Sequence, residues 1–124
     1  MAALYSQIIL DHFRNPRNYG RLSSPDVTYE QVNPLCGDRI RIELEIRDRI
    51  ITRAGFVGDG CAISVAAASV LTELIAGTGI ESEEMISDVK LLAALESEIK
   101  PSRMKCALLP LEALRYGVKN YKQD

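Results

Sequence analysis

Hydrophobic and polar residues alternate most regularly in the first half of the chain. Residues 40–47 place isoleucine or leucine at every second position and arginine or glutamate between them, which is typical of a strand with one buried and one solvated face. Residues 27–32 are rich in β-branched and aromatic residues, and residues 50–57 run back from a hairpin corner at Asp48 and Arg49. The pattern predicts a three-stranded antiparallel sheet.

A helical period replaces the alternation outside this sheet. Apolar residues predict a helix over residues 4–13, which should end before Pro16 because the residue before a proline avoids the helical conformation. His12, the only histidine, is expected to carry a favourable charge at the end of that helix. A longer helix is predicted from Cys61 to the glycines at 77 and 79. Its more polar face carries Ser64, Ala68, Thr72 and Glu73.

The C-terminal third is expected to form further helices. Serines followed by acidic residues at 82–84 and 87–88 are typical helix N-caps, so two short helices are predicted, the second reaching about residue 98. Pro101 breaks that helix and separates it from a last one. The core face of the last helix is expected to carry Met104, Leu108, Leu111, Leu114, Val118 and Tyr121.

Composition narrows the class of protein. The 124 residues are expected to form one domain, residues 1–124. With 15 basic and 17 acidic residues, a formal charge of -2 and 6% aromatic residues, no nucleic-acid partner is expected. Residues 61–80 are apolar enough to suggest a membrane span, but Glu73 within them makes insertion costly. Since the N-terminal residues also lack the pattern of a signal peptide, a cytoplasmic location is expected.

Cys61 follows two glycines at the predicted change from strand to helix. Unpaired backbone N–H groups and the dipole of a helix favour an anion at its N-terminus. The pKa of this thiol is therefore expected to be lowered, which would make Cys61 a good nucleophile or metal ligand. The alternative is that Cys61 is a small buried hydrophobic residue.

Each of the three cysteines falls where a regular element is predicted to begin. Cys36, Cys61 and Cys106 are separated by 25 and 45 residues, so they contain no CxxC pair of the kind that zinc fingers use. Cys106 lies off the predicted core face of the last helix, and Pro110 lacks the N–H that would bond the Cys106 carbonyl. Because element ends gather distant residues, the three thiols are expected to meet at one exposed tip.

Three thiolates need one more ligand to complete a tetrahedral set. Asp38, two residues after Cys36, is the candidate, because a carboxylate binds Zn²⁺ well and an iron–sulfur centre more weakly. The alternative role for Asp38 is to cap the turn after Pro34. Lys105 adjoins Cys106 and is expected to lower the thiolate pKa and to offset negative charge, unless it is only a solvated lysine at a helix start.

Five segments stand in a fixed order along the chain: Leu4-Tyr5 through Asp11-His12, Asn15-Pro16-Arg17-Asn18, Asn33-Pro34-Leu35-Cys36-Gly37-Asp38, Gly58-Asp59-Gly60-Cys61-Ala62-Ile63-Ser64 and Lys105-Cys106. With them the chain resembles the U-type iron–sulfur cluster scaffolds, the IscU/SufU/NifU N-terminal family, over nearly its whole length. The resemblance implies an α+β two-layer fold with a three-stranded antiparallel sheet and helices packed on one face. It also implies that Cys36, Asp38, Cys61 and Cys106 carry the cluster or a zinc ion.

The subfamily stays open. In having lysine at position 105, before the last cysteine, the chain resembles the SufU-like proteins, whereas IscU-like scaffolds usually have histidine there. The interval between Cys61 and Cys106 is short for a SufU-like member, which usually carries an insertion. Residues 99–103 replace the chaperone-recognition stretch that is expected of IscU.

The function that we predict is the assembly of a [2Fe–2S] cluster. A cysteine desulfurase would supply persulfide sulfur, and the finished cluster would pass to apo-proteins by ligand exchange, so the protein would be a scaffold rather than an enzyme. The alternative is a zinc-containing sulfur acceptor that stimulates the desulfurase and passes sulfur on. Whether the protein is monomeric or forms a homodimer or homo-oligomer around the cluster stays open.

Overall fold

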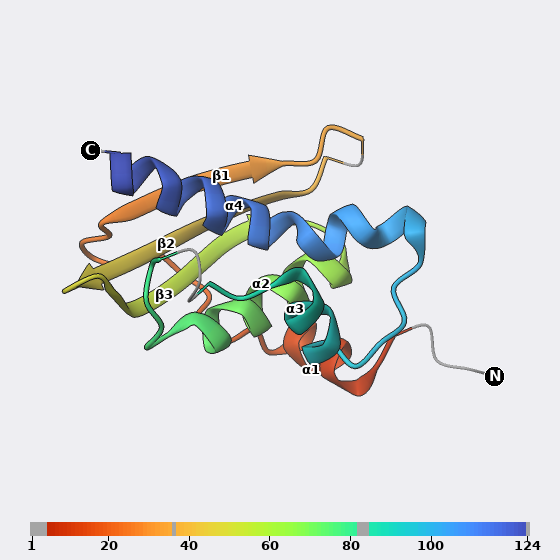
Figure 1. Ribbon diagram of the computed structural model, residues 1–124. Helices are drawn as coiled ribbons and strands as arrows, with labels where there is room; N and C mark the ends of the chain where they lie inside the picture. The colour runs from red at the N-terminus through yellow and green to blue at the C-terminus, as the bar shows by residue number, and fades with distance from the viewer. Residues whose placement is uncertain (1–4, 36, 82–84, 124) are drawn as a thin grey trace.

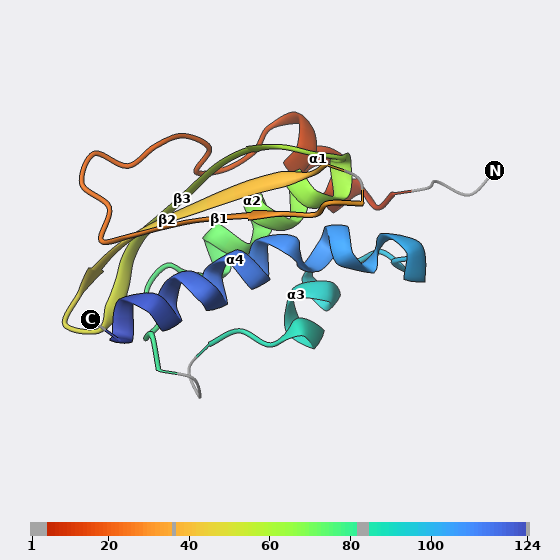
Figure 2. The same cartoon turned by 90° about the horizontal axis from the view of Figure 1, so that it is seen from above.

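A computed structural model of the protein describes residues 5–35, 37–81 and 85–123. They form a two-layer α+β fold with helices on one face of the sheet, as predicted (Figure 1, Figure 2). Helices α2 and α4 contact the sheet, α1 packs on α2, and α3 packs on α2 and α4. The elements are α1 (Gln7–Arg14), β1 (Val27–Val32), β2 (Arg39–Arg47), β3 (Ile50–Asp59), α2 (Ala62–Ile75), α3 (Asp88–Ala94), the 3₁₀ turn η2 (Pro101–Arg103) and α4 (Met104–Gln123).

The sheet is an antiparallel meander in the order β1-β2-β3. Asp48 and Arg49 join β2 to β3 with φ angles of 53° and 63°, the left-handed conformation of hairpin turns whose twist matches that of the strands. A register shift beside Glu45 makes Arg39 the partner of Asp59 at the far end of the hairpin. This shift decides which residues face each other where the two strands end.

α2 is the buried centre of the helical layer. It contacts α1, α3, α4 and the sheet. Ser64, Ala68 and Thr72 were expected on an outer polar face, and this is wrong: all three are fully buried. Other helices cover the side of α2 that the sheet leaves free. Buried hydroxyl groups need hydrogen-bond partners, and those of α2 find them at two separate places.

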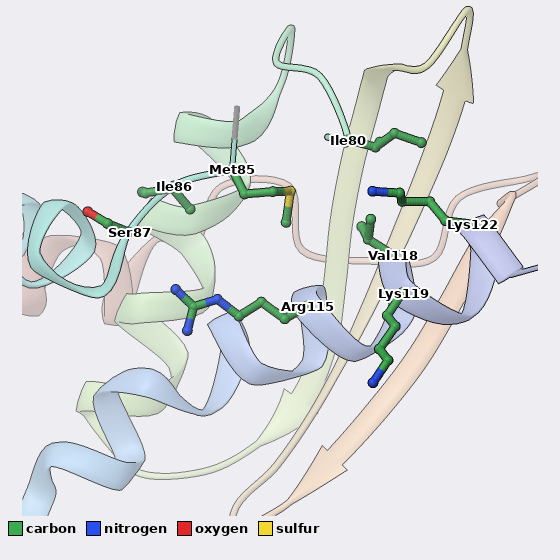
Figure 3. Close-up of a pocket in the computed structure, with 8 residues that line it drawn as sticks. All are labelled: Ile80, Met85, Ile86, Ser87, Arg115, Val118, Lys119 and Lys122. Carbon is green, nitrogen blue, oxygen red and sulfur yellow. The ribbon is translucent and has the colours of Figure 1, made fainter. Parts of the chain in front are cut away.

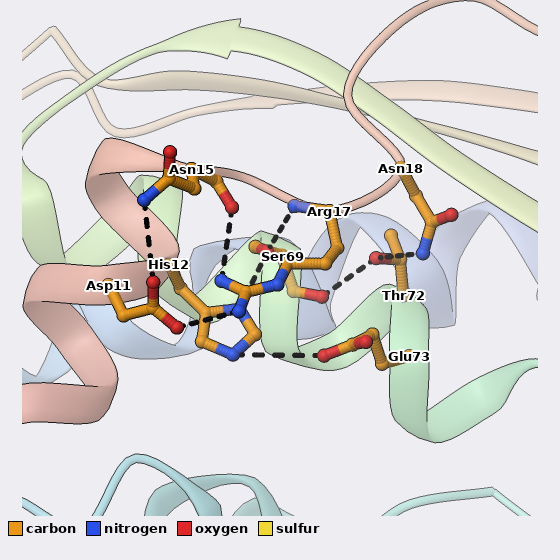
Figure 4. Close-up of polar contacts among 8 residues, drawn as sticks. All are labelled: Asp11, His12, Asn15, Arg17, Asn18, Ser69, Thr72 and Glu73. Carbon is orange, nitrogen blue, oxygen red and sulfur yellow. Dashed lines mark hydrogen bonds and ion pairs between the residues drawn. The ribbon is translucent and has the colours of Figure 1, made fainter.

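At one of these places, hydrogen bonds hold α1 and the segment after it against α2 (Figure 4). His12 Nδ1 lies 2.7 Å from Ser69 Oγ, which also accepts a hydrogen bond from the backbone N–H of Arg17 at 2.8 Å. Asn18 Nδ2 donates to Thr72 Oγ1 at 3.1 Å. His12 is buried, and burial, followed by the charge of Arg17, lowers its pKa. The lowered pKa opposes the charge that was expected of His12 at the helix end.

Helix boundaries differ from the sequence predictions at two places. α1 begins at Gln7 because Ser6 is its N-cap. α3 ends at Ala94 rather than near residue 98, because Glu96 adopts a positive φ of 51° and so leaves the helical conformation. The short helix predicted at 82–84 lies outside the described residues.

α4 continues through Pro110 and buries a different arc from the one predicted. Leu111 and Leu114 are buried as expected, whereas Met104 and Leu108 are only half-buried. The helix packs on α2 as well as on β1 and β2. Because α4 is covered on two sides, an additional flank of this helix is buried and becomes part of the core.

The apolar stretch that suggested a membrane span forms α2 and the segment after it, and α2 is buried against the protein's own elements. Across the described ranges, no helix combines the length and the apolar character that crossing a bilayer requires.

Candidate functional site

Two paired strand ends bring the candidate ligands together. β2 begins directly after Asp38, β3 ends directly before Gly60 and Cys61, and Arg39 pairs with Asp59 between them. The pairing places Asp38 beside Gly60, at the end of the sheet that lies to the right in Figure 1. Gly60 allows this approach because a Cβ there would lie only 3.2 Å from Asp38 Cγ.

Asn33 organises the turn that leads into Asp38. Its side-chain Oδ1 accepts a hydrogen bond from the N–H of Leu35 at 3.0 Å, and its carbonyl accepts one from Gly37 at 2.7 Å. Its own N–H donates to the carbonyl of Asp38 at 2.8 Å. Asn33 is buried, so these bonds fix the turn from the inside. Asparagine before proline is a frequent turn-forming signal, and the sequence from Asn33 to Asp38 is typical of a turn.

Three of the four predicted ligands converge. Cys61 is the N-cap residue of α2, and Cys106 lies in the first turn of α4. Their Sγ atoms and a carboxylate oxygen of Asp38 all lie within 4.8 Å of one another. Cys36, the fourth predicted ligand, lies outside the described residues. The convergence joins three segments that are far apart in the sequence.

Cys106 is more deeply buried than the sequence suggested. It is 4% exposed and belongs to the hydrophobic core, so its predicted place off the core face is wrong. The reason is the packing of α4 on α2, which encloses the flank that carries Cys106. Cys61 is half-buried. Of these two thiols, one is therefore sheltered and the other is accessible.

Ser64 connects the candidate ligands, a role that the sequence analysis did not foresee. Its Oγ lies 2.7 Å from Asp38 Oδ2, 3.2 Å from the carbonyl oxygen of Cys106 and 3.6 Å from Cys61 Sγ. The sequence contains a signal for this contact, since Ser64 follows Cys61 by three residues and such residues lie on the same side of a helix.

Negative charge is concentrated at this site. Burial, and then the neighbouring Cys61 and Asp38, raise the pKa of the Cys106 thiol to about 12. Cys61 first, then Tyr5 and a hydrogen bond to Cys106, also raise the pKa of the Arg103 guanidinium, whose charged form they favour. The site therefore favours a bound cation, whether a proton or a metal ion.

Lys105 lies at the surface beside the turn that leads into Asp38. Its side chain is exposed and lines a shallow cavity of about 170 Å³ together with Pro34 and Leu35 of the turn before Asp38. Arg103 interacts with both described thiols. A role for Lys105 in cluster chemistry stays a prediction.

The donor set suits a thiophilic metal. Tetrahedral zinc binds thiolate sulfur at about 2.3 Å and carboxylate oxygen at about 2.0–2.2 Å, which sets its ligand atoms roughly 3.5–3.8 Å apart. Sγ and oxygen atoms within 4.8 Å of one another need only small side-chain movements to reach that geometry. A soft sulfur pair with one hard oxygen fits Zn²⁺ or iron better than Mg²⁺ or Ca²⁺.

A more voluminous cavity than the one beside Lys105 lies elsewhere (Figure 3). It has a volume of about 600 Å³ and lies between Ile80 and residues 85–87 on one side and the C-terminal half of α4 on the other, with Met85 and Val118 in its apolar lining. Val118 is about 18 Å along the helix axis from Cys106 at 1.5 Å per residue. The residues described as lining this cavity include no thiol or carboxylate.

The chain is similar in sequence to known proteins over almost its whole length. A protein-family model described as the NifU-like N terminal domain matches residues 4–124. The chain is 39% identical to the zinc-dependent sulfurtransferase SufU of Bacillus subtilis, covering 93% of this chain and 89% of that protein. It is 34% identical to the iron–sulfur cluster assembly scaffold protein IscU of Azotobacter vinelandii, covering 95% and 94%.

Solved structures share the fold. The crystal structure of FiSufU from Fervidobacterium islandicum matches with a TM-score of 0.77 at 24% identity, over 93% of this chain and 96% of that one. The N-terminal structure of a NifU-like protein from Brucella abortus matches with a TM-score of 0.76 at 17% identity, over 98% and 96%. At these identities the match bears on the fold alone.

Proposed function

The chain belongs to the family of NifU-like N-terminal domains, and from this premise we propose that it is an assembly scaffold for iron–sulfur clusters. The observation that supports this most directly is the convergence of Asp38, Cys61 and Cys106 within 4.8 Å. With Cys36 as the fourth ligand, they would hold a [2Fe–2S] cluster as cargo. Relatives over almost the whole chain, including IscU of Azotobacter vinelandii, are named as such scaffolds.

Asp38 as a ligand would make the release of a bound cluster easier. A carboxylate is a harder ligand than a thiolate and holds an iron–sulfur centre more weakly. An incoming thiolate of an apo-protein can therefore replace Asp38 first. A scaffold needs this property, whereas a permanent cluster site does not.

Cys61 is the thiol that we assign to sulfur uptake, because it is the more exposed of the two described ones. Its thiolate would attack the outer sulfur of a persulfide on a cysteine desulfurase. A new S–S bond forms on Cys61, the old one breaks, and the desulfurase cysteine leaves as a thiolate. Converting two such sulfurs to sulfide takes four electrons, of which two come from two ferrous ions and two from an external electron donor.

Zinc-dependent sulfur transfer is the second candidate function. It is favoured by the 39% identity to a zinc-dependent sulfurtransferase and by a donor set that suits tetrahedral Zn²⁺. In this role Asp38, Cys61 and Cys106 would hold zinc, which would keep the thiols deprotonated. The desulfurase partner and the persulfide step would be the same, and no cluster would form.

One anaerobic experiment separates the two functions. The protein is purified without added metal, its zinc and iron are measured, and it is then incubated with ferrous iron, cysteine, a cysteine desulfurase and dithiothreitol. The scaffold role predicts visible absorbance from a [2Fe–2S] cluster, which transfers to an apo-ferredoxin.

Stoichiometric zinc, strong stimulation of desulfurase turnover and no visible absorbance would instead support sulfur transfer. Absence of metal, cluster and stimulation would contradict both roles. The variant Ser102→Ala, which changes an exposed residue of η2, serves as the control and should behave as the unmodified protein does.

A further inference from the structure

Ser64 lies where three segments of the site meet. It is on α2, Asp38 precedes β2, and Cys106 is on α4. The side chain of Ser64 is completely buried, so its hydroxyl proton cannot be given to bulk water. Its hydrogen bond therefore goes to one of the protein groups around it.

Distance and charge decide which group accepts the proton. A serine hydroxyl carries one proton, and the nearest acceptor is Asp38 Oδ2 at 2.7 Å. A hydrogen bond to a carboxylate is stronger than one to a neutral group. The Cys106 carbonyl at 3.2 Å and Cys61 Sγ at 3.6 Å are longer contacts.

Pro110 explains why Ser64 also approaches the backbone of α4. In an uninterrupted helix the N–H of residue 110 would bond the carbonyl of Cys106, but proline has no N–H. Ser64 Oγ lies 3.2 Å from that carbonyl. The hydroxyl of Ser64 therefore lies against two ligand-bearing segments and donates its proton to the one that carries Asp38.

We propose that Ser64 is the positioning residue of the metal site and acts by orienting the carboxylate of Asp38. This inference rests on the proposed function, because it takes Asp38, Cys61 and Cys106 as ligands. A carboxylate can rotate and can bind through one oxygen or both. A hydrogen bond that fixes one oxygen holds the group in a single orientation, and the loss of such a partner typically costs about 10–100-fold in metal affinity.

The test measures zinc binding by competition with a chelator, on the apo-protein and without any partner. Ser64→Ala is expected to raise the dissociation constant for Zn²⁺ by about tenfold, whereas Ser64→Thr, which keeps a hydroxyl, should restore most of the affinity. The matched control is Ser69→Ala. Ser69 is another fully buried serine of α2, but its hydroxyl contacts His12 and Arg17, so zinc affinity should change less than twofold.

A double-mutant cycle shows whether Ser64 acts through Asp38. In the Asp38→Ala background, Ser64→Ala should have almost no further effect on zinc affinity. An equal loss in both backgrounds would overturn the proposal, as would unchanged affinity in Ser64→Ala. Circular dichroism of each apo-variant checks that it is folded, and if Ser64→Ala does not fold, the affinity of Ser64→Thr decides the question.

The two proposals fail in different ways. If the unmodified protein binds neither zinc nor iron, the proposed function is wrong. If it binds zinc and Ser64→Ala binds equally well, only the role of Ser64 is wrong.

Discussion

His12 shows at the scale of one residue how tertiary contacts change a side chain's chemistry. The sequence places it at the end of α1, where a protonated histidine would be favourable. Instead it is buried with Nδ1 at 2.7 Å from Ser69 Oγ and Nε2 at 3.7 Å from Glu73 (Figure 4). Burial and Arg17 lower its pKa, and the opposing effects of Glu73 and Asp11 are smaller.

This lowered pKa predicts a loss of stability in mild acid. The unfolded state binds a proton on His12 near the ordinary pKa of 6.5, whereas the folded state binds it only at lower pH. Stability is therefore complete above pH 6.5 and decreases as the pH falls from there toward the folded pKa, by at most about 1.4 kcal/mol per pH unit for one proton. Urea unfolding at pH 7.5 and 5.5 measures the decrease.

The control for this prediction is His12→Gln, which keeps a hydrogen-bonding group but does not titrate. It should be less stable than the unmodified protein at pH 7.5 and should lose less stability between the two pH values. An identical pH dependence in both proteins would show that His12 is not responsible.

The β2–β3 hairpin is the element that sets the distance between Asp38 and Cys61. Its far end depends on Gly58, where a Cβ would lie 2.1 Å from the carbonyl oxygen of Arg39. That oxygen belongs to the backbone of the partner strand and cannot turn aside as a flexible side chain could. The close approach therefore requires glycine.

Gly58→Ala should accordingly separate the two strand ends. We expect a loss of about 1–3 kcal/mol in the free energy of unfolding, together with weaker zinc binding, because Asp38 and Cys61 flank the displaced pair. Urea unfolding and chelator competition measure the two effects. The control Arg53→Ala, at an exposed position of the same strand, should change stability by no more than about 0.5 kcal/mol. A Gly58→Ala protein with unchanged stability and affinity would contradict this account.

At the scale of the whole molecule, the candidate site links the sheet to two helices. Asp38 and Cys61 lie at the strand ends and Cys106 lies on α4, so a bound metal ion would fasten three parts of the fold together. A ligand that binds only the folded state stabilises it by about 2.7 kcal/mol at a free concentration of about 100 times its dissociation constant.

Zinc is therefore expected to raise the melting temperature of the apo-protein by roughly 10 °C at that concentration, as estimated for a domain of this size. Thermal unfolding followed by circular dichroism, with buffered free zinc and with a chelator, measures the shift. Cys106→Ser should show a much smaller shift. An equal shift in both proteins would place the zinc elsewhere.

The sequence by itself determined the strands, the long helices and the identity of the candidate ligands. Alternation at residues 40–47 depends on neighbours in the chain, and so does the helical spacing that follows Cys61. Asp38, Cys61 and Cys106 were recognisable because each stands at the edge of a regular element. These properties depend on residues that are close in the chain, so the spacing of residues in the sequence is enough to predict them.

Tertiary structure alone decided how those ligands are supported. Helices packed on the side of α2 that the sheet leaves free turned Ser64 from a residue of the more polar face into a buried partner of Asp38, and the packing of α4 on α2 enclosed Cys106. The register shift beside Glu45 set the pairing of Arg39 with Asp59. Each of these depends on contacts between residues that are distant in the chain, and hydrophobic periodicity shows that a face is buried without showing what covers it.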